Sequence, residues 1–267
     1  MATLTEPLRA APPVPTDVPA SHRLRGGWVL EALAVLGLFQ VYDWARDRAQ
    51  GPAASAFRNA KQVIHWERVL GLYQEHAMQQ WVLPHHPLVS FWNIWYGTIH
   101  FVMPAVALVW LYRRAPARYV RWRNTFLFML ALSILGFWLY PLMPPRLLPH
   151  AYGFVDTPAK FFGFGKPTAN SVKEFGNLYA AMPSLHVGWS TWTVLALYPL
   201  LRRDWTRALL VAYPVSTIFA ITVTGNHFLL DAVGGWIALA IGYALAIALE
   251  RWRDSPRTGL PVAQARV

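Results

Sequence analysis

The amino-acid sequence predicts an all-α fold: a polytopic membrane protein built as a six-transmembrane-helix bundle, with an interfacial amphipathic helix in the first outer loop. Hydrophobic residues make up 55% of the 267 residues and charged residues only 14%, a balance that is rare in soluble domains. The apolar residues gather in runs close to the roughly 20 residues needed to cross a bilayer. Basic residues concentrate in short segments between these runs, as in cytoplasmic loops of membrane proteins.

The chain divides into two tails and one domain. Residues 1–26 are rich in Pro and Ala and lack the apolar core of a signal peptide, so we expect a disordered cytoplasmic tail. Residues 27–250 are expected to form a single transmembrane domain, and residues 251–267 a second cytoplasmic tail. The candidate spans, in order, are 27–44, 88–112, 124–143, 184–201, 208–224 and 227–249.

The positions of the basic residues predict the orientation. If the N-terminus is cytoplasmic, four groups of arginines all face the cytoplasm, and segments 45–87 and 144–183 face outward. The four groups are Arg23 and Arg25; Arg113, Arg114, Arg118, Arg121 and Arg123; Arg202, Arg203 and Arg207; and Arg251, Arg253 and Arg257. We therefore expect an integral protein of the plasma (inner) membrane with both termini cytoplasmic. The net charge of +11 is then a property of loops beside a bilayer, and no nucleic-acid partner is expected.

The first outer segment carries an amphipathic pattern at residues 59–73. Its apolar positions recur at helical spacing and alternate with charged residues, which predicts a helix lying in the membrane interface. The apolar positions are Val63, Trp66, Leu70 and Tyr73, and the charged ones are Lys61, Glu67 and Arg68. Tryptophans near the span ends predict an interfacial belt; they are Trp28, Trp44, Trp110, Trp122, Trp205 and Trp252.

His227 and Asp231 form the first candidate catalytic pair. They are four residues apart at the start of the last apolar run, so a helix beginning near Asn226 places both side chains on one face. A carboxylate that accepts a hydrogen bond from one imidazole nitrogen fixes the tautomer and makes the other nitrogen a better nucleophile. The alternative is a buried His–Asp pair that serves packing. Inserting an acidic residue within a membrane span costs roughly 2.5–3.5 kcal/mol of free energy. Because of this cost, a functional role for Asp231 is favoured over packing alone.

His186 and Arg146 are the further candidates on the outer face. His186 follows Pro183 and Ser184 at the start of an apolar run, where unpaired N–H groups and the Ser184 hydroxyl can hold an anion while His186 transfers a proton. Arg146 ends a run in which two prolines stop the preceding span, and a guanidinium binds phosphate through two hydrogen bonds. The alternatives are a plain helix start for His186 and an interfacial anchor for Arg146.

Metal and thiol chemistry are not predicted. The chain has no cysteine, and its remaining histidines lack the spacing of a metal site, so we expect neither a metal nor another cofactor. Those histidines include His65, His76, His85, His86, His100 and His150. Glu31 lies within the first span and requires a polar partner, which the sequence does not identify.

Together these blocks resemble the type 2 phosphatidic acid phosphatase (PAP2) superfamily and, more closely, its branch of Aur1-like inositolphosphotransferases. The similar features are Pro144-Pro145-Arg146, the stretches 153–157 and 180–190, Gly225-Asn226-His227 continuing to Asp231 and Gly234, and, in the first outer loop, Trp66-Glu67, Leu70-Gly71-Leu72 and Glu75. The resemblance implies a metal-free, outward-facing site over the domain 27–250. It also implies that His227 attacks phosphorus, Asp231 orients His227 and His186 protonates the leaving oxygen. Arg146 and Ser184 are implied to hold the nonbridging oxygens.

The chain departs from the superfamily pattern at two cations. The lysine expected seven residues before Arg146 is Leu139, and the proline expected after it is Leu147; the expected Ser-Arg pair of the third motif is Ala220 and Ile221. Preorganised charge is usually the largest catalytic term, so other groups must offset the loss. The candidates are Lys160, Lys166, Lys173, Arg58, Lys61 and Arg68. Lys173 is favoured because it is near Ser184 in sequence, and Asn226 is expected to add a neutral hydrogen bond.

The leading hypothesis is a membrane enzyme that cleaves a lipid phosphate ester or pyrophosphate through a phosphohistidine. Transfer of the phospho-head group to a polyol such as inositol is the alternative within the same chemistry. A second class is a lipid-binding protein or a proton-coupled transporter in which His227, Asp231 and Glu31 relay protons. The expected partners are the bilayer, a lipid phosphate substrate and, for transfer, a polyol acceptor.

Overall fold

The computed structural model describes residues 27–161 and 176–255, which are helical and contain no β-strand. The long helices are α1 (Gly27–Arg48), α4 (His86–Arg114), α5 (Pro116–Leu139), α9 (Asp204–Val223) and α10 (Leu229–Asp254). The shorter ones are α2 (Ala53–Val69), α3 (Glu75–Val82), α6 (Thr157–Phe161) and α8 (Leu185–Leu197), with 3-10 turns η2 (Pro145–Leu147), η3 (His150–Tyr152) and η4 (Tyr198–Leu200). The predicted all-α class is confirmed.

Five of these helices, α1, α4, α5, α9 and α10, are long and apolar enough to cross a membrane. The sixth expected span, 184–201, is the 13-residue helix α8 followed by η4. At 1.5 Å per residue α8 rises about 20 Å, less than the roughly 30 Å of a hydrocarbon core. The count of six spans therefore stays a prediction.

One predicted span is displaced along the chain. The run expected at 124–143 is α5, which begins at Pro116 and ends at Leu139. The helix ends there because Tyr140 precedes Pro141, and the residue before a proline is driven out of the helical region; its φ is −137°. The prediction that Pro144 and Pro145 end this span was wrong. At the other end of the domain, α10 continues to Asp254, beyond the boundary expected at residue 250.

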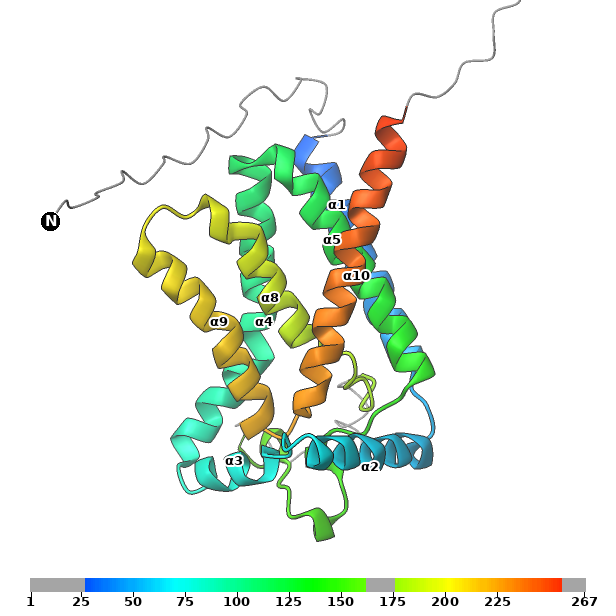
Figure 1. Ribbon diagram of the computed structural model, residues 1–267, viewed down its shortest axis with the longest axis vertical. Coiled ribbons are helices and arrows are strands. Elements are labelled where there is room, and N and C mark those ends of the chain that lie inside the picture. Colours follow the sequence, from blue (N-terminus) through cyan, green and yellow to red (C-terminus); the bar gives the residue numbers. More distant parts are fainter. Residues whose placement is uncertain (1–26, 162–175, 256–267) are drawn as a thin grey trace, which may run out of the picture.

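The helices form a bundle closed at one end by two crosswise helices. In Figure 1 the five long helices and α8 run along the long axis, and α2 and α3 lie across the lower end. The start of α1, the end of α10 and the α4–α5 connection lie toward the opposite end. Arg113 and Arg114, in the last turn of α4, are thus remote from α2 and α3.

Helix α2 buries a different face from the one predicted. Its buried residues are Ala56, Ala60, Val63, Ile64 and Glu67. Of the predicted apolar stripe only Val63 is on this face, whereas Trp66 and Leu70 are more than half exposed. The small side chains of Ala56 and Ala60, four residues apart, allow α2 to pack against the bundle. Glu67 lies on the same buried face of α2. The placement of α2 in a membrane interface stays a prediction.

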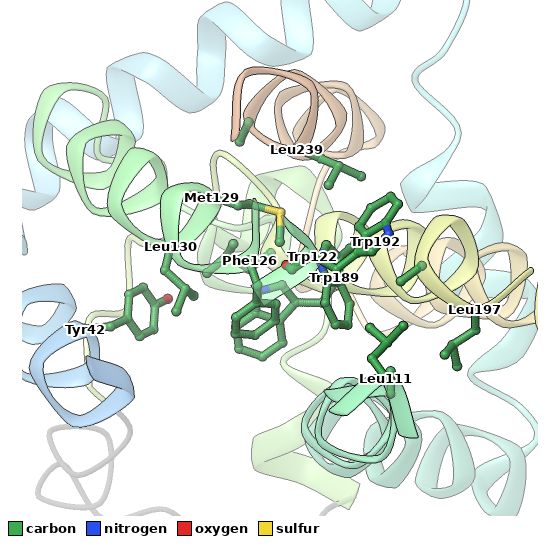
Figure 2. Packing of buried hydrophobic residues seen from close by; sticks show 14 of the residues in the cluster. Tyr42, Leu111, Trp122, Phe126, Met129, Leu130, Trp189, Trp192, Leu197 and Leu239 are labelled. Carbon is green, nitrogen blue, oxygen red and sulfur yellow. The ribbon is translucent and has the colours of Figure 1, made fainter. Parts of the chain in front are cut away.

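Aromatic residues from α5 and α8 fill the centre of the bundle (Figure 2). Trp122 and Phe126 of α5 pack against Trp189 and Trp192 of α8, and the indole N–H of Trp192 donates to the Trp122 carbonyl at 2.9 Å. Trp122 is therefore a buried core residue, which corrects its assignment to the interfacial belt. The other tryptophans assigned to the belt are exposed to between 40% and 70%.

Helix α10 approaches α8 closely at Gly235. A Cβ at this position would collide with the carbonyl oxygen of Ser184. Further along, a Cβ on Gly242 would lie 2.9 Å from the Thr125 carbonyl oxygen of α5. These glycines hold α10 against both neighbours and fix where its first turn lies.

The structure identifies the partner of Glu31. Its carboxylate forms an ion pair with Arg123 and accepts a hydrogen bond from the Tyr119 hydroxyl at 3.0 Å. Glu31 lies near the start of α1, at the end of the bundle away from α2 and α3. It neutralises one of the arginines that the sequence groups on the cytoplasmic side.

Candidate active site

The starts of α8 and α10 meet at the end of the bundle that α2 and α3 cross. The backbone N–H of Ser184, the residue before α8, donates to the carbonyl oxygen of Asp231 in α10 at 3.0 Å. This bond places the two predicted histidines beside each other, although they are 41 residues apart in the chain.

His227 lies in the tight loop between α9 and α10 and is 3% exposed. The loop turns at Gly225, whose φ of +69° favours glycine. The backbone N–H groups of Asn226 and His227 both donate to the carbonyl oxygen of Ile221. These backbone bonds hold the part of the loop that carries the His227 side chain.

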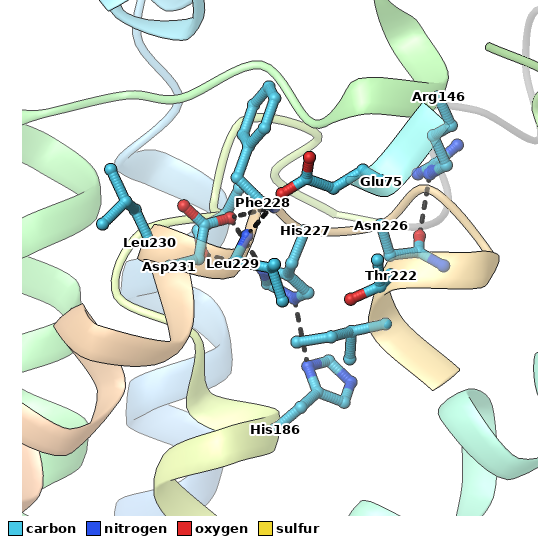
Figure 3. Close-up of polar contacts among 12 residues, drawn as sticks. Glu75, Arg146, His186, Thr222, Asn226, His227, Phe228, Leu229, Leu230 and Asp231 are labelled. Atoms are coloured by element: carbon cyan, nitrogen blue, oxygen red, sulfur yellow. Dashed lines mark hydrogen bonds and ion pairs between the residues drawn. The ribbon is translucent and has the colours of Figure 1, made fainter. Parts of the chain in front are cut away.

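The nitrogens of His227 have distinct environments (Figure 3). Nδ1 lies 2.9 Å from the Ala181 carbonyl oxygen and 3.2 Å from Oδ2 of Asp231. Both neighbours are acceptors, so Nδ1 carries the hydrogen and Nε2 keeps a lone pair. Asp231 is fully buried, and its Oδ2 also accepts the N–H of Phe228 at 3.0 Å. The helix begins at Leu229 rather than near Asn226, yet the pair still meets.

His186, in the first turn of α8, faces the free nitrogen of His227. Its Nδ1 lies 3.3 Å from Nε2 of His227. The ring stacks on Tyr96 at 4.1 Å between centroids and 18° between planes, and it contacts His100 at 4.1 Å. Tyr96 and His100, both on α4, were not predicted as site residues, because helical spacing alone does not show that they face another helix.

Arg146 of η2 is held next to the histidine loop. Its Nε donates to Oδ1 of Asn226 at 2.8 Å, and its Nη1 lies 3.0 Å from Oδ1 of Asp156. Asn226 in turn donates to the Thr224 hydroxyl at 2.8 Å. The Arg146 side chain is 17% exposed, so it stands at the border between the buried pair and solvent. Asp156 belonged to a quoted motif but had no predicted role.

Ser184 provides an unused polar group at the start of α8. It occupies the N-cap position, is fully buried, and its Oγ makes no hydrogen bond to any residue that the structure describes. The N–H groups of Leu185 and His186 have no helical acceptor, as is general for a first turn. A hydroxyl and free N–H groups at a helix start suit an anion.

The start of α10 is different, because carboxyl groups already occupy its N–H groups. Oε1 of Glu75 accepts the N–H of Leu229 at 2.9 Å, and Oε1 of Glu67 accepts the N–H of Leu230 at 2.8 Å. Both glutamates are fully buried. Burial, reinforced by the neighbouring Glu75 carboxyl, raises the pKa of Glu67 to about 9. The first N–H groups of α10 are therefore not available to an anion.

The predicted replacement cations lie elsewhere or outside the described residues. Lys166 and Lys173 fall in residues 162–175, which the structure does not describe. Lys160, Arg58, Lys61 and Arg68 are exposed, and they contact the Phe161 ring, the Ser55 hydroxyl, the Phe57 ring and the Tyr73 ring respectively. Leu139, where the family pattern has a lysine, is exposed at the end of α5 and lines a surface cavity of about 500 Å³ with Arg48 and Arg58.

Within residues 27–161 and 176–255, no three His, Cys, Asp or Glu side chains are grouped so as to hold a metal ion. The expectation of a metal-free site stays a prediction.

Comparison with known families gives one match. A family model described as the PAP2 superfamily matches residues 61–245, a segment that contains all of the site residues above. No curated protein and no solved structure matches the chain.

Proposed function

This chain belongs to the PAP2 superfamily, and on that premise we propose that it is a membrane lipid phosphatase or phosphotransferase. The proposed substrate is a lipid phosphate ester or pyrophosphate, and the proposed intermediate is a phosphohistidine on His227. One observation carries the proposal: His227 contacts Asp231 through Nδ1 and His186 through Nε2, so the three side chains form one chain of polar contacts.

In the first step Nε2 of His227 attacks phosphorus. A P–N bond forms as the P–O bond to the lipid leaving group breaks, and the imidazole gains positive charge. The Asp231 carboxylate beside Nδ1 stabilises that charge. His186 gives its proton to the departing oxygen.

Substrate binding requires His186 to move. In the structure Nδ1 of His186 and Nε2 of His227 are within hydrogen-bond distance, 3.3 Å, which leaves no room for a phosphoryl group. We propose that the His186 ring slides along the Tyr96 face on which it stacks. The resting contact then protects the nucleophile until a substrate separates the rings.

The nonbridging oxygens are proposed to bind between Arg146 and the start of α8. Arg146 supplies the positive charge, and Ser184 Oγ with the first N–H groups of α8 supplies neutral donors. Asn226 orients the guanidinium rather than the phosphate, since its Oδ1 accepts from Arg146. Lys173, which lies outside the described residues, is proposed as a further source of positive charge.

In the second step a hydroxyl attacks the phosphohistidine. Water or an acceptor alcohol loses its proton to His186, the new P–O bond forms, and the P–N bond breaks to regenerate His227. Hydrolysis and transfer to a polyol differ only in this acceptor, and transfer is proposed because of the resemblance to the Aur1-like branch. Opposing roles for the two histidines predict a bell-shaped dependence of rate on pH.

The site is proposed to face away from the cytoplasm. Arg113 and Arg114 lie at the end of the bundle opposite to His227, and clustered arginines favour the cytoplasmic side. The plasma (inner) membrane and cytoplasmic termini are proposed on the same ground. The proton-relay alternative gains no support, because Glu31 is paired with Arg123 at the far end.

The decisive experiment uses purified protein in detergent micelles and a panel of ³²P-labelled lipid phosphates and pyrophosphates. We expect rapid quenching to trap acid-labile phosphate on His227, and His227→Ala to abolish trapping and turnover. His65→Ala, a change at an exposed histidine of α2, is the matched control. Adding inositol distinguishes transfer from hydrolysis by the labelled product. Full activity in His227→Ala would refute the proposed nucleophile.

A further inference from the structure

Three carboxyl groups bind three consecutive N–H groups at the start of α10. Two of these groups come from distant segments, Glu67 from α2 and Glu75 from α3. The pairs are Phe228 with Asp231 at 3.0 Å, Leu229 with Glu75 at 2.9 Å, and Leu230 with Glu67 at 2.8 Å. The helix dipole offers only about half a positive charge here, so three ionised carboxylates in one buried place would repel strongly.

The second oxygens of the two glutamates are also unusual. Oε2 of Glu67 and Oε2 of Glu75 are buried and have no hydrogen-bond partner among the described residues. The two carboxyl groups are neighbours, and burial together with Glu75 raises the pKa of Glu67 to about 9. One proton shared by the two carboxyl groups would remove one negative charge and let one carboxyl donate a hydrogen bond to the other.

We propose that Glu67 and Glu75 share one proton and act as a pair of positioning residues, holding the start of α10 so that His227 and Asp231 keep their reactive geometry. The inference rests on the proposed function for its effect on rate, but the shared proton itself does not.

The route from this pair to the nucleophile is short. Leu229 and Leu230 lie directly between His227 and Asp231 in the chain, and their N–H groups are the ones that the glutamates bind. When the pair loses its proton, two buried anions repel each other and the nearby Asp231. Other titratable groups near the pair are Arg68, in the last turn of α2, and Tyr73, between α2 and α3. Displacement of the Leu229–Leu230 segment then moves Asp231 away from His227 Nδ1.

Four variants separate positioning from mere stability. In Glu67→Gln and Glu75→Gln the amide oxygen still accepts a backbone N–H, and the amide NH₂ replaces the shared proton. We expect kcat to fall less than about threefold in each at neutral pH. In Glu67→Leu and Glu75→Leu an acceptor is lost, and we expect kcat to fall at least about tenfold with KM little changed. Glu250→Gln, a change in the ion pair with Arg121 near the other end of α10, is the matched control.

Infrared spectroscopy tests the shared proton without any substrate. Wild-type protein at neutral pH should show the C=O stretch of a protonated carboxylic acid, and this band should vanish in both Gln variants. A band that persists in either Gln variant would overturn the sharing. A Leu variant with wild-type kcat, measured on folded protein, would overturn the positioning role. If the wild type forms no phosphohistidine, the proposed function fails, while the infrared result still decides the shared proton.

Discussion

The backbone N–H of Ser184 donates to the carbonyl oxygen of Asp231 at 3.0 Å, so the residue that begins α8 is bonded directly to the first turn of α10. This contact links the two halves of the proposed site through the backbone. It exists because Gly235, one turn further along α10, has no side chain to separate the helices.

Replacing Gly235 by Ala should therefore damage both stability and activity. The added Cβ would collide with the Ser184 carbonyl oxygen, and overpacking of this kind costs about 1–3 kcal/mol. We expect a lower melting temperature in detergent and a reduced kcat, because His186 moves with the start of α8. Gly37→Ala in α1 is the control, since a Cβ added there would meet nothing within 4 Å, and it should be neutral or slightly stabilising. Equal behaviour of the two variants would contradict the close approach.

Asp231→Asn separates the charge of this residue from its structural role. The amide oxygen can still accept the Phe228 N–H, so the melting temperature should change little, whereas Asp231→Ala should lower it through loss of the cap. The phosphorylation rate of His227 should fall on the order of 10²-fold or more in both variants, because no anion stabilises the charged imidazole. Rapid-quench kinetics would measure it, and a near-normal rate in Asp231→Asn would remove Asp231 from the mechanism.

Arg146→Lys keeps the charge but not the geometry. A lysine ammonium cannot bind Asn226 and Asp156 while also presenting a planar pair of donors to phosphate. We expect kcat/KM to fall on the order of 10²-fold. Arg121→Lys, which alters an exposed ion pair with Glu250, should remain within about twofold of wild type. An unaffected kcat/KM in Arg146→Lys would show that phosphate is held elsewhere.

The buried Glu67 carboxyl predicts how stability changes with pH. Its pKa is about 9 in the folded protein and near the ordinary value of 4.5 when unfolded. The folded state therefore binds the proton more tightly, so the stabilising contribution is complete below pH 4.5 and is lost as pH rises through 9. Melting temperatures of the wild type should decline over this window more steeply than those of Glu67→Gln. Parallel curves for the two proteins would show that Glu67 titrates normally.

The sequence was sufficient for the all-α fold class and for the contact between His227 and Asp231, whereas the roles of the site residues stay predictions. The spacing of His227 and Asp231 predicts their contact whether the helix begins at residue 226 or 229, since either start leaves both near the first turn. His186 and Arg146 follow from motif order. The apolar runs likewise predict the five long helices within a few residues, apart from α5, where Pro141 and not Pro144 ends the helix.

What the sequence could not supply were contacts between distant segments. The buried face of α2 is formed largely by small alanines rather than by its largest apolar residues. A prediction based on the large apolar residues therefore assigned the wrong face of the helix to the interior. Trp122 is buried because α8 packs over it, although its position in the sequence resembles that of an interfacial tryptophan. The partners of Glu31 lie on α5, 88 and 92 residues away, and no local pattern indicates them.

The crosswise helices α2 and α3 also bear on how such a site could be re-used. Grafting the two histidine motifs onto another membrane scaffold would carry over His186, His227 and Asp231. It would leave the amides of Leu229 and Leu230 without acceptors, because Glu67 and Glu75 come from segments that lie outside the long helices. A grafted site without α2 and α3 should therefore contain the reactive side chains but not hold them in the required geometry.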